Sequence, residues 1–186
     1  MFNKAIATIL LFLLVMLPMH GQKSDAADDV LQHVPMATVL ALRACGLQSA
    51  SPSWTELAAS AAAAYTLSAA TTYALKHTCH EQRPDDSDRH SFPSGHATFA
   101  FAGATVLMKE YGQRSPWIAV GGYGLATLVA ADRVRRDRHY VHDVVAGAAI
   151  GFAATELTYF LKRKVIKNRN IDLSLSGLQL DVAVRW

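Results

Sequence analysis

Apolar residues recur at helical spacing in five stretches of this chain, and short polar clusters separate these stretches. The spacing predicts helices over residues 30–45, 53–75, 94–111, 117–133 and 140–164. Two of the starts carry capping signals: Ser53 is followed three residues later by Glu56, as in a capping box, and Ser94 follows a proline. Alanine and other small residues fill many of the apolar positions, which favours helices that pack closely.

The two ends of the chain follow other patterns. Residues 1–21 combine an early positive charge, an apolar run and a polar end, which predicts an export signal or a first membrane span. Apolar and polar residues alternate over 171–186, and this period of two predicts a strand or a short hairpin. We therefore expect a leader at 1–21, a helical domain over 22–168 and a strand-like tail over 169–186.

Composition narrows the choice of partners and the redox chemistry. The 186 residues suffice for one domain with a hydrophobic core. The formal net charge of +3 permits an anionic substrate or a membrane surface, and we expect no nucleic-acid partner. Cys45 and Cys79 can form at most one disulfide; two partly buried thiols are the simpler expectation, and a bridge is the alternative in an exported chain.

Three polar clusters between the helical segments carry the candidate chemistry, at residues 76–84, 93–96 and 132–143. Lys76, Arg83 and Arg133 are candidate ligands for a phosphate-like anion, because a guanidinium group can bind two of its oxygens at once. Each of them alone is weak evidence, since an arginine near a helix end is usually a solvated charge.

The second cluster places Ser94 and Gly95 at the start of an expected helix. A helix N-terminus offers free amide groups and the positive end of a dipole, and a glycine lets an anion approach the backbone closely. His96, in the first turn, would be able to protonate a leaving oxygen. The alternative is an ordinary helix cap with an unrelated histidine.

His139 and Asp143 are four residues apart and therefore share one face of a helix. The carboxylate can hold one ring nitrogen of His139 and leave the other free to attack phosphorus. A plain surface contact is the alternative at this spacing, and we expect His142 to take no part.

A metal site is a competing interpretation near the first cluster, where His77, Cys79, His80 and Glu81 lie close in sequence. Zinc binds such residues, but their spacing matches none of the usual zinc patterns. We therefore predict neither a metal nor a cofactor.

Together, the three clusters resemble the signature of the type 2 phosphatidic acid phosphatase superfamily: Lys-x6-Arg-Pro, then Pro-Ser-Gly-His, then Ser-Arg-x5-His-x3-Asp. The first two elements are present in full at residues 76–84 and 93–96. The third is matched at its spacing by Arg133, His139 and Asp143.

One position departs from the family pattern. Asp132 stands where the family has Ser. Because a carboxylate on the phosphate would repel it, we expect Asp132 to point away or to pair with an arginine.

The resemblance implies an all-α fold, a compact helical bundle of about five core helices, and metal-independent hydrolysis of a phosphate ester or pyrophosphate. By this resemblance, the phosphoryl group is bound by Lys76, Arg83, Ser94, Gly95 and Arg133. It further implies that His139 attacks phosphorus and forms a phosphohistidine. His96 would then protonate the leaving oxygen, and Asp143 would orient His139.

Four functions stay open at this point. The first is a membrane-associated phosphatase for a phosphorylated lipid, with its site facing the periplasm or exterior and basic residues such as Lys109 and Arg114 on the other side. The second is a soluble periplasmic acid phosphatase for small phosphate esters. The others are a vanadium-dependent haloperoxidase-like enzyme and a non-catalytic phospholipid-binding protein.

Overall fold

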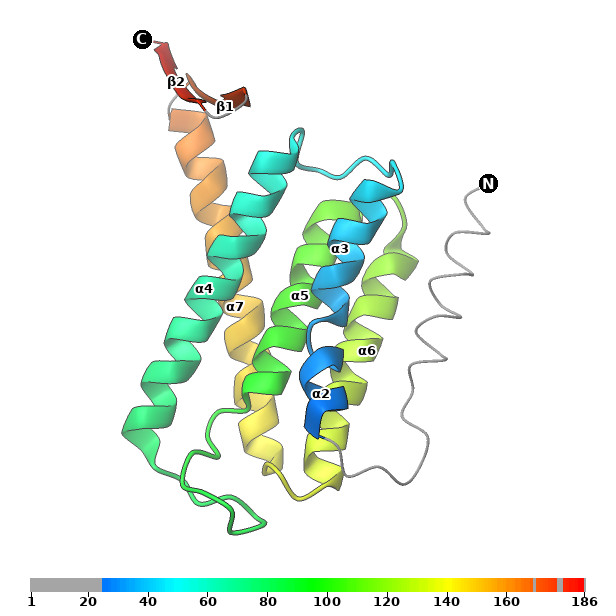
Figure 1. Ribbon diagram of the computed structural model, residues 1–186, viewed down its shortest axis with the longest axis vertical. Helices are drawn as coiled ribbons and strands as arrows, with labels where there is room; N and C mark the ends of the chain where they lie inside the picture. The colour runs from blue at the N-terminus through cyan, green and yellow to red at the C-terminus, as the bar shows by residue number, and fades with distance from the viewer. Residues whose placement is uncertain (1–24, 169, 177–178, 186) are drawn as a thin grey trace.

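The computed structural model describes residues 25–168, 170–176 and 179–185, so the expected leader at 1–21 lies outside the described residues. The helices are α2 (Asp25–Leu31), α3 (Val34–Ala44), α4 (Trp54–Cys79), α5 (Gly95–Tyr111), α6 (Pro116–Arg135) and α7 (Val141–Asn168). They pack into a helical bundle, which confirms the expected all-α fold (Figure 1).

Capping residues and a proline determine where several of the helices begin. The Ser53 hydroxyl accepts a hydrogen bond from the Glu56 amide at 3.1 Å at the start of α4, and Ser94 caps α5 through the Ala97 amide. The single helix expected over 30–45 is wrong, because a turn divides it into α2 and α3. The break comes just before Pro35, which cannot donate a helical hydrogen bond and therefore favours the first turn of a new helix.

Helix α5 is the centre of the bundle and packs against α3, α4, α6 and α7 (Figure 1). The approach of α7 to α5 is very close at two glycines. A Cβ atom at Gly147 would lie 2.4 Å from the Ser94 carbonyl oxygen, and one at Gly151 would lie 2.2 Å from the Thr98 carbonyl oxygen. These positions therefore need glycine because the facing backbone occupies the space of a side chain.

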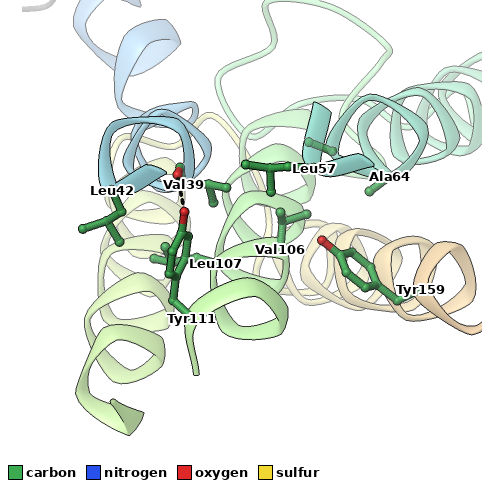
Figure 2. Close-up of a cluster of buried hydrophobic side chains, with 9 residues drawn as sticks. Val39, Leu42, Leu57, Ala64, Val106, Leu107, Tyr111 and Tyr159 are labelled. Atoms are coloured by element: carbon green, nitrogen blue, oxygen red, sulfur yellow. Dashed lines mark hydrogen bonds between the residues drawn. The ribbon is translucent and has the colours of Figure 1, made fainter. Parts of the chain in front are cut away.

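The largest cluster of buried apolar side chains lies where α3, α4, α5 and α7 meet (Figure 2). Val39, Leu57 and Val106 are fully buried in it. Tyr111 is also fully buried, and its hydroxyl donates to the Val39 carbonyl at 3.0 Å. This core fixes the part of α5 that lies away from the polar clusters.

The up-and-down course of α4 to α7 brings the polar clusters to one end of the bundle. Helices α4 and α6 end there, whereas α5 and α7 begin there (Figure 1). At the opposite end α7 leads into β1 (Asn170–Ser176), which pairs in antiparallel fashion with β2 (Gln179–Arg185). The period-two tail therefore forms a hairpin far from the clusters.

One helix among the described residues is long and apolar enough to cross a membrane, namely Val141–Val165 within α7, with a mean hydropathy of 1.6. Much of its surface is exposed, including Val145, Phe152 and Phe160. Cys45 and Cys79 are free and exposed, so the expectation of partly buried thiols is wrong: both lie at or beyond the end of a helix, clear of the core.

Candidate active site

His139 and Asp143 meet in the buried interior of the cluster end. His139 precedes α7 and Asp143 lies in its first turn, so the expectation that the two share one face of a helix is wrong. The side chains still meet, with Nδ1 of His139 3.3 Å from Oδ2 of Asp143. The Asp143 side chain is fully buried and the His139 side chain is 3% exposed. The pair that sequence spacing indicated is therefore formed in the interior, and a plain surface contact is excluded.

The Asp143 carboxylate is held by two further donors. The Ser91 hydroxyl donates to Oδ2 at 2.5 Å, and the Tyr140 amide donates to the same oxygen at 2.9 Å. Ser91 is itself fully buried and lies 3.4 Å from Nδ1 of His139. Sequence reasoning missed Ser91, although its position two residues before Pro93 was a signal that it belongs to the second cluster.

Burial keeps the His139 ring neutral near pH 7. It lowers the pKa of His139 from the usual 6.5 to about 4, and the positive charges of Arg83 and Lys76 act in the same direction. Asp143 opposes the shift through its charge and hydrogen bond. With Nδ1 directed at Asp143, Nε2 is the ring nitrogen left for attack on an electrophile.

Lys76 and Arg83 bring positive charge close to His139. The Lys76 ammonium, in the last turn of α4, donates to the His90 carbonyl at 2.6 Å. Burial, followed by the charge of Arg83, lowers the pKa of Lys76 to about 8. Arg83 pairs with Asp88 at 2.9 Å. Both side chains thus bind the loop between α4 and α5, and both lie close enough to His139 to lower its pKa.

The start of α5 lies against Asp143. The Ser94 amide donates to the Asp143 carbonyl at 3.0 Å, which fixes the N-terminus of α5 beside the start of α7. At Gly95 the direction of a Cβ atom is open, with no other atom within 4 Å. The site therefore combines a helix N-terminus, open space at Gly95 and a buried neutral histidine, an arrangement suited to bind an anion and attack it.

His96 and Arg133 are engaged by α2, which the sequence did not connect to the site. Nε2 of His96 lies 2.9 Å from Oδ1 of Asp29. Nη1 of Arg133, almost fully buried, donates to Oδ2 of Asp28 at 2.8 Å, and Arg136 also donates to this oxygen. No local motif marks Asp28 or Asp29, because their role depends on how α2 packs.

Asp132 pairs with arginines rather than with the anion site, as expected. Its Oδ1 accepts from Arg135 at 2.6 Å, and its Oδ2 lies 3.8 Å from Arg136. The departure from the family signature thus adds a surface ion pair one residue before Arg133.

The candidate metal ligands of the sequence do not assemble. Among the residues the structure describes, the group with ligand atoms close enough for a metal ion is instead Glu81, His142 and Asp143. Nε2 of His142 lies 2.7 Å from Glu81 and 3.2 Å from Oδ1 of Asp143. His142, expected to take no part, therefore touches the carboxylate that holds His139.

Comparison with known proteins gives the class. The model of the PAP2 superfamily matches residues 57–167, which include all three polar clusters, and the chain belongs to this family. The chain is 37% identical over 148 residues to the lipid A 1-phosphatase of Porphyromonas gingivalis, covering 80% of this chain and 33% of that protein.

A second relative is similar over part of the chain, and a solved structure shares the fold. The probable diacylglycerol pyrophosphate phosphatase 1 of Schizosaccharomyces pombe is 28% identical over 102 residues, covering 49% of this chain and 37% of that protein. The chain thus spans about a third of the length of the curated relatives it matches. The crystal structure of Aquifex aeolicus LpxE has the same fold, with a TM-score of 0.56 at 22% identity over 81% of this chain and 94% of that one.

Proposed function

We propose that this chain is a metal-independent phosphatase that hydrolyses a lipid-linked phosphate monoester or pyrophosphate through a phosphohistidine on His139. The observation that carries the proposal is the buried, neutral His139 held by Asp143 beside the N-terminus of α5. Lys76 and Arg83 lie close enough to lower the pKa of this histidine, so an anion bound there meets positive charge and the attacking nitrogen together.

The reaction needs two steps. In the first, Nε2 of His139 forms a bond to phosphorus, the bond from phosphorus to the leaving oxygen breaks, and His96 gives its proton to that oxygen. In the second, His96 takes a proton from water, the water oxygen binds phosphorus and the phosphorus–nitrogen bond breaks. Asp143 stabilises the positive charge that His139 gains on attack, as the orienting carboxylate of a catalytic triad does.

Positive groups offset the charge of the phosphoryl group in this proposal. Lys76, Arg83, Arg133, the Ser94 hydroxyl and the Gly95 amide are the proposed ligands, since the Ser94 amide is already bonded to the Asp143 carbonyl. Arg133 is paired with Asp28 in this structure, so phosphate must share or replace that contact. With cations and helix amides already present, the chemistry needs no metal to neutralise charge.

A lipid substrate and a membrane location are supported by the relatives and by the surface of α7. Both curated relatives are named for phosphorylated lipids, lipid A and diacylglycerol pyrophosphate. The candidate span Val141–Val165 exposes large apolar side chains that water would solvate poorly. We place the chain at a membrane, with the cluster end toward the periplasm or exterior.

Phosphate release from a panel of substrates tests the proposal. The panel contains lipid A, phosphatidate, diacylglycerol pyrophosphate, phosphatidylglycerophosphate and the soluble ester p-nitrophenyl phosphate, each assayed in detergent with and without chelator. We expect a higher kcat/KM for a lipid than for the soluble ester, and no loss with chelator. Equal rates on all substrates would favour a non-specific acid phosphatase, and no release from any of them would contradict the proposal.

A further inference from the structure

Helix α2 supplies two neighbouring carboxylates to the site, although it lies outside residues 57–167 that match the family model. Asp28 holds Arg133, one of the proposed phosphoryl ligands. Asp29 holds His96, the proposed proton donor. Two consecutive residues therefore contact two different parts of the proposed machinery.

The two carboxylates differ in burial, and this difference indicates different roles for Asp28 and Asp29. The Asp28 side chain is 7% exposed and lies between Arg133 and Arg136, so it anchors α2 to the end of α6 through buried ion pairs. The Asp29 side chain is 63% exposed, and water would solvate its charge without any partner. Its contact with His96 is therefore not required by burial, and follows from the position that Asp28 gives to α2.

We infer that Asp29 is a positioning residue for the proton donor, which holds Nε2 of His96 and leaves Nδ1 for the leaving oxygen. The inference rests on the proposed function, because it assigns a partner to the proton donor of that reaction. Asp29 stands to His96 as Asp143 stands to His139: each carboxylate fixes one ring nitrogen and stabilises the positive charge that the ring carries during the reaction.

Opposing charges face His96 from two helices. Burial, followed by the positive charge of Arg133 on α6, lowers the pKa of His96 below its usual value. The carboxylates of Asp29 and Asp28 on α2 act in the opposite direction. Loss of the charge at position 29 therefore lowers this pKa further, and less of the enzyme carries the proton that the leaving oxygen requires.

The test compares leaving groups in the full-length protein. Asp29→Asn keeps the shape of the side chain and removes its charge. We expect it to lower kcat/KM by about tenfold for an alkyl phosphate, corresponding to about one pKa unit. It should change kcat/KM for p-nitrophenyl phosphate little, because kcat/KM reports the first step and not the later attack of water, in which His96 acts as the base. A p-nitrophenolate leaves without a proton, so its release does not depend on His96. The basic limb of the pH profile for the alkyl phosphate should also move to lower pH.

Three matched variants separate positioning from structure. Asp29→Glu should restore most of the alkyl phosphate rate, and Asp86→Asn, at an exposed acid outside the three clusters, should change nothing. Asp28→Asn, which removes the anchor, should lower thermal stability and slow all substrates alike. Equal losses on both substrates in Asp29→Asn, or an unmoved basic limb, would overturn the role of Asp29 while leaving the proposed function intact. Absence of phosphate release by the wild type on every substrate would instead overturn both.

Discussion

Two buried carboxylates lie at opposite ends of the bundle and serve different purposes. Asp143 is fully buried, and Ser91, the Tyr140 amide and the ring of His139 surround its Oδ2. Glu110 is 3% exposed and accepts hydrogen bonds from the Ser51 amide, the Ser51 hydroxyl and the Tyr159 hydroxyl.

Both carboxylates are buried and hydrogen-bonded, so they differ only in the groups that bind them. The donors around Glu110 do not change their charge near neutral pH, so this carboxylate ties the 50–53 segment and α7 to α5 and does no more. Asp143 instead holds a histidine that can gain and lose a proton. A buried carboxylate is therefore a sign of function only when its partner titrates or reacts.

The largest effect is predicted for variants in which each buried carboxylate is replaced by the corresponding amide. Asp143→Asn should keep the fold and lower kcat by about 10⁴-fold, as for the orienting Asp of a catalytic triad. Glu110→Gln should leave kcat of the folded protein unchanged and lower the free energy of unfolding by about 1–3 kcal/mol. The reason is that an NH2 group, which cannot accept a hydrogen bond, would replace one of the two oxygens that accept from Ser51 and Tyr159. Kinetics and thermal unfolding on both variants check this, and a large kcat loss in Glu110→Gln would contradict the comparison.

The next prediction concerns the α5–α7 contact that joins the two ends. In Gly151→Ala the new methyl group meets the Thr98 carbonyl, and overpacking should cost about 1–3 kcal/mol of stability. Gly121→Ala is the matched control on α6, where nothing lies within 4 Å, and should be neutral or stabilising by up to about 1 kcal/mol. Thermal unfolding in detergent measures both, and equal melting temperatures would show that the close approach is not required.

The smallest effect is a shift in pH dependence. Below its pKa His139 is protonated and cannot attack, so kcat/KM should fall with falling pH only below the usual 6.5, toward pH 4. Lys76→Gln removes a positive charge that lowers this pKa, so the acid limb should move to higher pH. Arg89→Gln, at an exposed cation, is the control. A limb at or above 6.5 in the wild type, or one unmoved in Lys76→Gln, would contradict the electrostatic account.

The sequence predicted most of what local chemistry determines. The caps at Ser53 and Ser94, the spacing from His139 to Asp143 and the gathering of the three clusters at one end all follow from short-range patterns and helix direction. Asp28 and Asp29 could not be found in this way, since they reach Arg133 and His96 only through the packing of α2. The division of the helix before Pro35 is what allows α2 to take its own direction, and the apolar spacing over 30–45 does not indicate this division.

The most direct test of the central claim is to trap the reaction on the enzyme. The wild type is mixed with a substrate carrying a labelled phosphoryl group, quenched within milliseconds under conditions that preserve phosphohistidine, digested and mapped by mass spectrometry. We predict label on His139 in the wild type, and neither label nor turnover in His139→Ala that keeps the wild-type helical content. Label on Ser94 or on no residue in an active wild type, or an unchanged rate in His139→Ala, would contradict the account.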